Sequence, residues 1–242
     1  MVKSISLVFP MYNEREYIAH SIFKAKSVLE EITSDFEIII VDDASNDGSG
    51  GILDELVRED PRIKAIHHLR NRKLGGALKS AFSFASKEIV IYSDIDNPFD
   101  LSLLPGFIKL ISEADIVIGY RIGIRESFRK LAYSKVYNWL IRKIYRLNLR
   151  DINFSMKIFR KTALDRFCLK SEGSFISAEA LAKANYLGYK IREVPVPYFC
   201  RKYGCSRLTT LSVIIKIIFE MVKFYPEIVS FKKKRQNAAS QS

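Results

Sequence analysis

Short apolar runs rich in β-branched residues alternate with amphipathic stretches through the first half of this chain. The apolar runs cover Ile5 to Phe9, Phe36 to Val41, Ile63 to His67, Ile89 to Tyr92 and Ile116 to Ile118, with helical patterns such as Glu14 to Ile32 between them. This alternation is typical of βαβ units, so it predicts an α/β fold with a mostly parallel sheet flanked by helices. Because ligands of such sheets bind beyond the carboxyl ends of the strands, the polar residues at those ends are the candidates for chemistry.

The second half of the chain continues this pattern and then becomes helical. Helical patterns cover Ser127 to Leu149 and Phe175 to Leu187, and strand patterns cover Phe154 to Phe159 and Lys190 to Pro197. The segment Leu208 to Tyr225 is apolar except for polar residues at helical spacing, and its charges argue against a membrane span, which needs ~20 mainly apolar residues. We predict that this amphipathic helix ends at Pro226, because proline lacks the backbone N–H that a continuing helix needs.

Length and composition indicate one domain with a small C-terminal appendage. A chain of 242 residues, 48% of them hydrophobic, can bury a full core. We predict one catalytic domain over residues 1–207, an amphipathic, membrane-interfacial segment over residues 208–231, and a basic, disordered tail over residues 232–242. The first residues show no secretory leader and three cysteines are too few for a disulfide framework. We therefore expect a peripheral protein on the cytoplasmic face of a membrane.

Positive charge is concentrated in one segment. The formal net charge is +12, and the segment Arg121 to Lys161 holds twelve Lys or Arg residues against two acidic ones. A nucleic acid, an anionic bilayer or a diphosphate-bearing substrate could each meet this segment, and a solvated helix face would show the same composition. Tyr133, Tyr137 and Tyr145 could stack on single-stranded nucleic acid, but their spacing is also that of helix core positions. Charge alone does not choose between these partners.

The strongest polar cluster, Tyr92 to Asn97, directly follows an apolar strand. Its carboxylates, Asp94 and Asp96, occupy alternate positions and can converge on one hard divalent cation, Mg²⁺ or Mn²⁺, which accepts carboxylate and phosphate oxygens. A loop made only of turn-forming residues would also contain Asp, Asn and Pro98. We predict a metal at Asp94 and Asp96, with a plain turn as the alternative.

Two further polar clusters end strands. In Val41 to Gly48, a carboxylate such as Asp43 can accept hydrogen bonds from a nucleobase or a ribose hydroxyl, while other polar residues can cap the next helix. In Pro10 to Glu14, Tyr12 could face a base and Asn13 could cap the helix that follows. Together the three clusters predict a nucleotide site at the edge of the sheet.

These clusters resemble the family 2 glycosyltransferases of the GT-A, Rossmann-like fold, in which the corresponding strands end in P-x-Y-N-E, V-D-D-x-S-x-D and D-x-D. Further matching segments cover nearly the whole chain and look most like the dolichyl-phosphate mannosyltransferase and polyprenyl-phosphate glycosyltransferase branch; they are Asn71 to Ala77, Gly119 to Arg121, Asp151 to Lys157, Gly188 to Val196 and Arg201 to Ser206. The resemblance implies an inverting, metal-dependent transfer of a hexose from GDP-mannose or a UDP-sugar to a polyprenyl or dolichyl phosphate. The Q-x-x-R-W motif of processive polysaccharide synthases is absent from the sequence.

The resemblance also implies roles for individual residues. Nucleotide-sugar binding falls on Pro10, Tyr12, Glu14, Asp43, Lys73, Asp94 and Asp96, of which Asp94 and Asp96 would hold the Mg²⁺ or Mn²⁺. Acceptor-phosphate binding falls on Arg121, Arg129, Lys130, Ser134 and Arg201. The implied catalytic residues are Asp96, Arg121 and Arg201.

The excess of arginine also bears on the acceptor. A hydroxyl acceptor needs a general base near the attacking oxygen, whereas a phosphate monoester is already anionic and needs cations that hold two phosphate groups together. Guanidinium groups bind phosphate oxygens bidentately, so the basic segment suits a phosphate acceptor. Glu179 and Asp151 are the residues that could instead act as a base toward a sugar or protein hydroxyl. Such a hydroxyl transferase and a basic nucleic-acid-binding module are the two alternatives.

Overall fold

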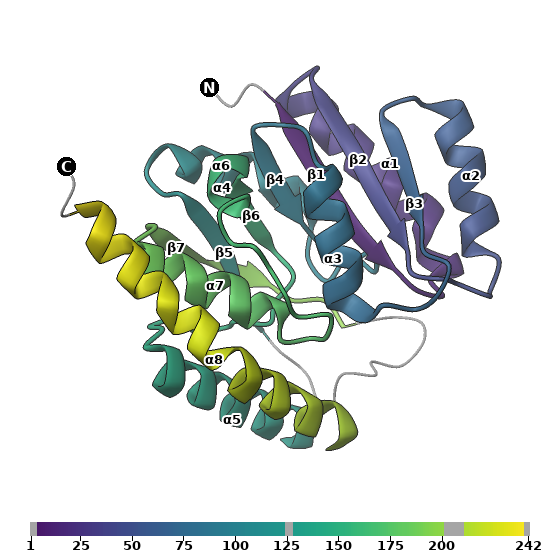
Figure 1. The fold of residues 1–242 in the computed structure, drawn as a ribbon. Helices are drawn as coiled ribbons and strands as arrows, with labels where there is room; N and C mark the ends of the chain where they lie inside the picture. Colours follow the sequence, from purple (N-terminus) through teal and green to yellow (C-terminus); the bar gives the residue numbers. More distant parts are fainter. Residues whose placement is uncertain (1–3, 124–127, 201–210, 240–242) are drawn as a thin grey trace.

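The fold is seen in a computed structural model, which describes residues 4–123, 128–200 and 211–239. In these parts of the chain seven strands form one sheet in the order β3-β2-β1-β4-β6-β5-β7 (Figure 1). The strands are β1 (Ile5–Met11), β2 (Phe36–Asp42), β3 (Ile63–His67), β4 (Ile89–Tyr92), β5 (Ile116–Ile122), β6 (Lys157–Arg160) and β7 (Ile191–Pro197). Only β6 runs antiparallel to its neighbours, so the predicted mostly parallel sheet is confirmed. The carboxyl ends of the other six strands therefore share one edge.

Helices cover both faces of the sheet. One face carries α1 (Arg15–Ile32), α2 (Ser49–Glu59) and α4 (Leu104–Lys109). Short 3₁₀ turns lie directly before and after α4, at Leu101–Leu103 and Leu110–Ser112. The other face carries α3 (Lys73–Phe84), α5 (Phe128–Tyr145), α6 (Lys161–Leu164), α7 (Ile176–Leu187) and α8 (Leu211–Ala239). In Figure 1 the long helix α8 crosses in front of α7 and lies beside α5.

The central strands supply side chains to both cores because alternate residues of a strand point to opposite faces. In β1, Leu7 and Phe9 enter the core beneath α1, while Val8 enters the core beneath α3. Every residue of β2 is buried. Strands covered on both faces read as continuous apolar runs, and this is why the sequence predicts them well.

Before α8, three boundaries differ from the prediction by three residues or more. The strand predicted from Phe154 begins only at Lys157. The strand predicted to end at Ile118 continues to Ile122, so it carries Arg121 to the edge of the sheet. The basic helix predicted to reach Leu149 ends at Tyr145, because the next residue has a φ of 53° and this left-handed conformation stops a helix.

The C-terminal helix α8 continues through Pro226, so the predicted helix end at this residue is wrong. A proline inside a helix costs about 3 kcal/mol. That cost is offset because Ile228 and Phe231, in the turns beyond it, are buried in the core. The helix reaches Ala239, so residues 232–239 are helical instead of disordered, and the predicted boundary between residues 231 and 232 falls inside a helix.

Candidate active site

The loops after β1 and β2 are joined by side-chain hydrogen bonds. The backbone N–H of Asn13 donates to the hydroxyl of Ser45 at 2.9 Å, and the side-chain carbonyl of Asn13 accepts from the backbone N–H of Asn46 at 2.9 Å. Asn13 therefore connects two loops and does not cap α1 as predicted; Glu14 occupies the N-cap position without a side-chain capping bond. The half-buried Tyr12 lies in the same loop.

The loop after β2 is joined in turn to the start of α3. Asp43 is 3% exposed, and its Oδ1 accepts a hydrogen bond from the backbone N–H of Arg72 at 2.8 Å. Lys73, the next residue, begins α3 with a φ of 61°. Since Pro10 lies in β1, which pairs with β2, the predicted donor-binding residues Pro10, Asp43 and Lys73 gather at one edge of the sheet.

Backbone strain is concentrated in these loops. In the described part of the chain six non-glycine residues have a positive φ, and four of them follow a strand at this edge; they are Asn13, Ala44, Lys73 and Asn97. Left-handed conformations cost non-glycine residues free energy and persist where the surrounding structure holds them, which is common at functional sites. The hydrogen bonds between these loops stabilise the left-handed conformations.

The D-x-D segment follows β4, the neighbour of β1. The hydroxyl of Tyr92 donates to Oδ1 of Asp94 at 2.8 Å. Burial, and then the nearby carboxylates of Asp94 and Asp96, raise the pKa of Tyr92 well above its ordinary value. Tyr92 therefore stays a protonated donor that orients Asp94.

This segment suits a divalent cation. Asp94 and Asp96 are half-buried, and the side-chain carbonyl oxygen of Asn97 is buried without a hydrogen bond to any described residue. Within the described ranges no group of three His, Cys, Asp or Glu side chains has an arrangement that could hold a metal ion by itself. Magnesium is commonly held by one or two carboxylates and completes its shell with water and substrate phosphate oxygens. Asp94 and Asp96 fit such a site, which a bound diphosphate would complete.

Arg121 and Asp151 form a bidentate ion pair at the same edge. Nε of Arg121 donates to Oδ2 of Asp151 at 2.7 Å, and a second guanidinium nitrogen donates to Oδ1 at 3.3 Å. The guanidinium also lies 5.3 Å from the ring centroid of Tyr198. The two paired side chains are only 16% and 9% exposed, so the carboxylate fixes the arginine in place.

A functional candidate that the sequence reasoning missed is Lys157, the first residue of β6. Its side chain is 1% exposed, its ammonium donates to the carbonyl of Phe154, and the ammonium lies 5.5 Å from the ring centroid of Tyr92. Burial lowers the pKa of Lys157 to about 8, although Asp151 and Asp94 act in the opposite direction. The signal in the sequence is a lysine directly before the apolar pair Ile158 and Phe159, within a short strand that ends in another basic residue.

Glu179, one of the two possible bases, is buried in an ion pair. It is 0% exposed, and its carboxylate accepts from the backbone N–H groups of Lys170 and Ser171, both at 2.8 Å. The ammonium of Lys183 lies 2.7 Å from it. All of these contacts lie inside the core beneath α8, so they assign Glu179 a structural role.

The remaining predicted residues lie on α5 or beyond the described ranges. Arg129, Lys130 and Ser134 occupy the first turns of α5, and their side chains are outside the described part of the structure. Arg201 lies outside the described residues altogether. Their approach to the phosphate site stays a prediction.

The tyrosines of α5 that the structure describes face inward. Tyr145 is fully buried and donates its hydroxyl to the carbonyl of Met221 at 2.7 Å. Tyr137 is packed against the same core, and burial raises the pKa of its phenol. These two side chains therefore form no exposed platform for stacking bases, which weighs against a nucleic-acid-binding module.

Comparison with known proteins agrees with this arrangement. The profile of the family described as Glycosyl transferase family 2 matches residues 6–171. The chain is 26% identical over 221 residues to undecaprenyl-phosphate mannosyltransferase of Micrococcus luteus, with 84% of this chain and 86% of that protein covered. It is 31% identical over 218 residues to undecaprenyl-phosphate 4-deoxy-4-formamido-L-arabinose transferase of Pectobacterium atrosepticum, with 88% and 65% covered.

A third relative is much longer than this chain. Glycosyltransferase AglD of Haloferax volcanii is 30% identical over 205 residues, which are 80% of this chain and 33% of AglD. The chain thus spans about a third of AglD, about two thirds of the arabinose transferase and most of the mannosyltransferase.

Solved structures share the fold at low sequence identity. Glucosyl-3-phosphoglycerate synthase of Mycobacterium tuberculosis in complex with UDP superposes with a TM-score of 0.67 at 17% identity, covering 94% of this chain and 80% of that chain. Mannosyltransferase PcManGT of Pyrobaculum calidifontis in complex with GDP-Man and Mn²⁺ superposes with a TM-score of 0.59 at 15% identity, covering 98% and 75%. The sheet and its helices are thus those of the GT-A fold.

Proposed function

The chain belongs to glycosyl transferase family 2 and is a glycosyltransferase; we propose that it moves a hexose from a nucleotide diphosphate sugar, GDP-mannose or a UDP-sugar, to a polyprenyl or dolichyl phosphate. One observation favours a phosphate acceptor over a hydroxyl: the carboxylates of Asp151 and Glu179, the two possible bases, are held by the cations of Arg121 and Lys183. A phosphate oxygen is already anionic and needs no base. The two undecaprenyl-phosphate transferases among the relatives support the same acceptor class.

The donor is proposed to bind along the edge that the three loops form. Tyr12, Glu14, Asp43 and Lys73 would surround the nucleoside, and Asp94 and Asp96 would hold Mg²⁺ or Mn²⁺ against the diphosphate. The bound cation would stabilise the negative charge that develops on the departing diphosphate. The structural neighbours with UDP, GDP-Man or Mn²⁺ bound support this class of donor and cofactor.

The transfer is proposed to be a single displacement with inversion. An oxygen of the acceptor phosphate attacks the anomeric carbon from the side opposite the diphosphate, and the carbon–oxygen bond to the diphosphate breaks as the new bond forms. Arg121, held by Asp151, would keep the two phosphate groups close despite their repulsion. Arg201, Arg129, Lys130 and Ser134 are proposed to bind the acceptor phosphate beside it.

The function is tested by a matrix of donors and acceptors. Purified protein is incubated with GDP-mannose, UDP-glucose or UDP-N-acetylglucosamine and either a polyprenyl phosphate or a soluble sugar, with Mg²⁺, Mn²⁺ or EDTA. We expect product only with the polyprenyl phosphate, loss of product with EDTA, and an inverted anomeric configuration by NMR. Transfer to the soluble sugar alone would select the hydroxyl-acceptor alternative.

Helices α5 and α8 present an apolar and basic outer face. The carboxylates of α8 point inward, since Glu220 accepts from the hydroxyl of Ser171 and Glu227 pairs with Lys183; α5 has no acidic residue. Among the side chains of the two helices that the structure describes, the exposed large apolar ones are Val136, Trp139, Ile218, Phe219, Val222 and Tyr225. Exposed basic side chains lie among them at Lys135, Arg142, Lys143, Lys216, Lys223 and Lys232.

This face has the chemistry of an interfacial helix pair. Aromatic rings sit at the level of lipid headgroups, and lysine or arginine side chains are attracted to anionic lipids. Across the described ranges, no helix has the length and hydrophobicity required to cross a bilayer. We propose peripheral attachment to an anionic, cytoplasm-facing membrane through this face, next to a lipid-borne acceptor. The inner side of α8 packs on α7, so we propose that only the outer side of α8 contacts the membrane.

A further inference from the structure

His68, the residue after β3, is a histidine that the proposed chemistry leaves without a role. Its side chain is buried, with 7% of its surface exposed, and both ring nitrogens are engaged. Nδ1 lies 2.6 Å from Oδ1 of Asp43, and Nε2 lies 2.8 Å from the hydroxyl of Ser80 on α3. The imidazole therefore links the end of β2 to the middle of α3 and is oriented at both ends.

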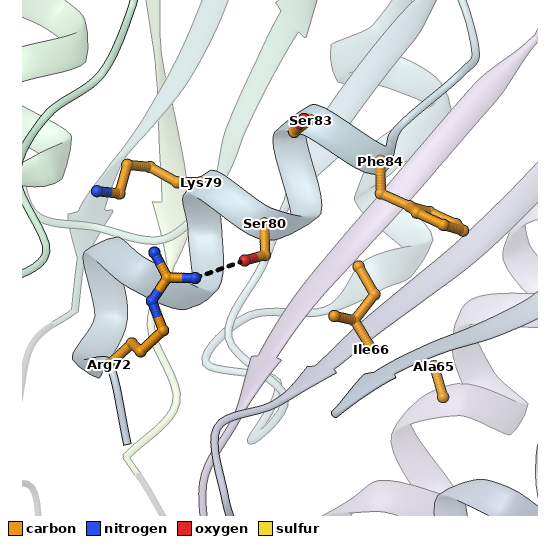
Figure 2. A pocket seen from close by; sticks show the side chains of 7 residues that line it. All are labelled: Ala65, Ile66, Arg72, Lys79, Ser80, Ser83 and Phe84. Carbon is orange, nitrogen blue, oxygen red and sulfur yellow. Dashed lines mark hydrogen bonds between the residues drawn. The ribbon is translucent and has the colours of Figure 1, made fainter. Parts of the chain in front are cut away.

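The partners of the two ring nitrogens decide where the ring proton lies. The guanidinium of Arg72 donates to the hydroxyl oxygen of Ser80 at 3.4 Å, as Figure 2 shows, on the wall of an open pocket of about 680 Å³. The carboxylate of Asp43 can only accept a hydrogen bond, so Nδ1 of His68 carries a proton and donates to Asp43. The hydroxyl of Ser80 has one hydrogen and can donate it to Nε2 while its oxygen accepts from Arg72.

Asp43 receives two donors on the same oxygen. Besides His68, the backbone N–H of Arg72 donates to Oδ1 at 2.8 Å, and the carboxylate side chain is 4% exposed. The carboxylate cannot turn without breaking both bonds. Oδ2 lies outside this pair of bonds, at the strand end where the nucleoside is proposed to bind.

We propose that His68 is a positioning residue for nucleotide binding: it fixes Asp43 so that Oδ2 accepts one hydrogen bond from an N–H of the base or an O–H of the ribose. This inference rests on the proposed role of Asp43 in donor binding. Without His68 the carboxylate is held by Arg72 alone, so affinity for the nucleotide falls. Asp94 and Asp96, which face the diphosphate, keep their geometry, so the rate at saturating donor is preserved.

The adjacent residue His67 provides a matched control. Its ring nitrogens also contact two side chains: Nδ1 lies 3.1 Å from Oδ2 of Asp42, and Nε2 lies 3.0 Å from Oδ1 of Asp54. Its side chain is 43% exposed, and neither Asp42 nor Asp54 is assigned to the donor. Replacing His67 removes the same chemical group one residue away without loosening Asp43.

The test measures UDP and GDP affinity by calorimetry with Mn²⁺, together with donor KM and kcat, in variants of His68, His67 and Asp43. His68→Ala is expected to weaken the binding of the preferred nucleotide and raise donor KM by about tenfold, with kcat within about twofold of wild type, as for loss of one hydrogen bond to a charged group. His68→Asn is expected to recover most of the affinity, because its amide nitrogen can take the place of Nδ1. His67→Ala is expected to bind like wild type.

The Asp43→Asn variant separates this inference from the proposed function. If Asp43→Asn weakens nucleotide binding and His68→Ala does not, His68 has no positioning role and the donor role of Asp43 stands. If Asp43→Asn also binds normally, both assignments are wrong. Should His68→Ala unfold, Ser80→Ala decides: a loss of affinity of about threefold supports the inference, because only the partner of Nε2 is removed, and wild-type affinity overturns it.

Discussion

The ammonium of Lys183 on α7 lies 2.9 Å from the carboxylate of Glu227 on α8 and 2.7 Å from that of Glu179 on its own helix. It also donates to the carbonyl of Cys168 at 3.0 Å. One fully buried cation therefore joins α8 to α7 and to the segment before it. Since buried charges are stable only when paired, this cluster determines how α8 is held.

Glu179→Gln should destabilise the fold. The change leaves the buried ammonium of Lys183 with one carboxylate fewer, which costs about 3 kcal/mol when a buried pair is broken. Urea unfolding measures the loss, with Asp165→Asn as the control, because Asp165 is exposed and its pair with Lys161 should contribute less than about 1 kcal/mol. A variant with normal stability and no activity would instead support Glu179 as a catalytic base.

Asp96→Ala should abolish transfer while the protein stays folded. One proposed ligand of the metal is lost, so charge on the departing diphosphate is left uncompensated, and we expect kcat to fall by on the order of 10²–10³ or more. Asp100→Asn is the matched control, since Asp100 is a nearby carboxylate that pairs with Lys24 and caps a 3₁₀ turn. Activity of Asp96→Ala within a few-fold of wild type would contradict the metal assignment.

The strand ends and their carboxylates can be predicted because β2 and β4 are covered on both faces. Such strands read as apolar runs, and the first carboxylates after them, Asp43 and Asp94, mark the edge where ligands bind. The antiparallel direction of β6 gives no comparable signal. The ion-pair partner of Arg121 could not be predicted either. Asp151 lies 30 residues farther along the chain, and it comes close to Arg121 in a fold where β5 pairs with β6.

Other features depend on tertiary packing that no local pattern encodes. Pro226 predicts a helix end from its own chemistry, yet burial of Ile228 and Phe231 outweighs that preference. Asn13 is a good helix cap by residue type, but its side chain bonds to Asn46 on another loop. In each case contacts between distant segments override a local preference.

Lys157→Met should change how stability depends on pH. Burial lowers the pKa of Lys157 to about 8, below its unfolded value of about 10.4. Between these values the unfolded chain binds more protons, so this lysine makes the folded state more stable as pH rises. Below pH 8 the full cost of the buried charge is present.

Urea unfolding of wild type and Lys157→Met at pH 7.5 and pH 10.5 measures this effect. The difference between the two proteins should shift in favour of wild type by roughly 2–3 kcal/mol over that range. Other groups titrate equally in both proteins and cancel in the difference. Parallel pH profiles would mean that the pKa of Lys157 is ordinary.

Arg201→Ala should impair use of the acceptor more than binding of the donor. Arg201 is proposed to bind the acceptor phosphate, and a bidentate guanidinium contact with phosphate is among the stronger hydrogen-bonded pairs. Acceptor KM is expected to rise by about tenfold or more, while calorimetry shows unchanged nucleotide affinity. Lost nucleotide binding with normal acceptor saturation would reassign Arg201 to the donor.

The outer face of α5 and α8 should bind anionic vesicles through its aromatic side chains. Trp139 and Phe219 are 54% and 66% exposed, and inserting each into the interface could contribute roughly 1.5–3 kcal/mol, while each nearby basic residue adds about 1 kcal/mol. The double variant Trp139→Ser, Phe219→Ser should therefore lose most binding in liposome co-sedimentation. Phe23→Ser is the control, because Phe23 is 74% exposed but lies on α1, on the opposite face of the sheet.

Raising the salt concentration should weaken membrane attachment of the wild-type protein, since salt screens the charges of lysine and arginine but does not affect the aromatic rings. If the wild-type protein stays in the supernatant with anionic vesicles at low salt, the outer face does not bind membranes and is instead a binding surface for a protein partner. The lipid acceptor or that partner must then bring the enzyme to the membrane.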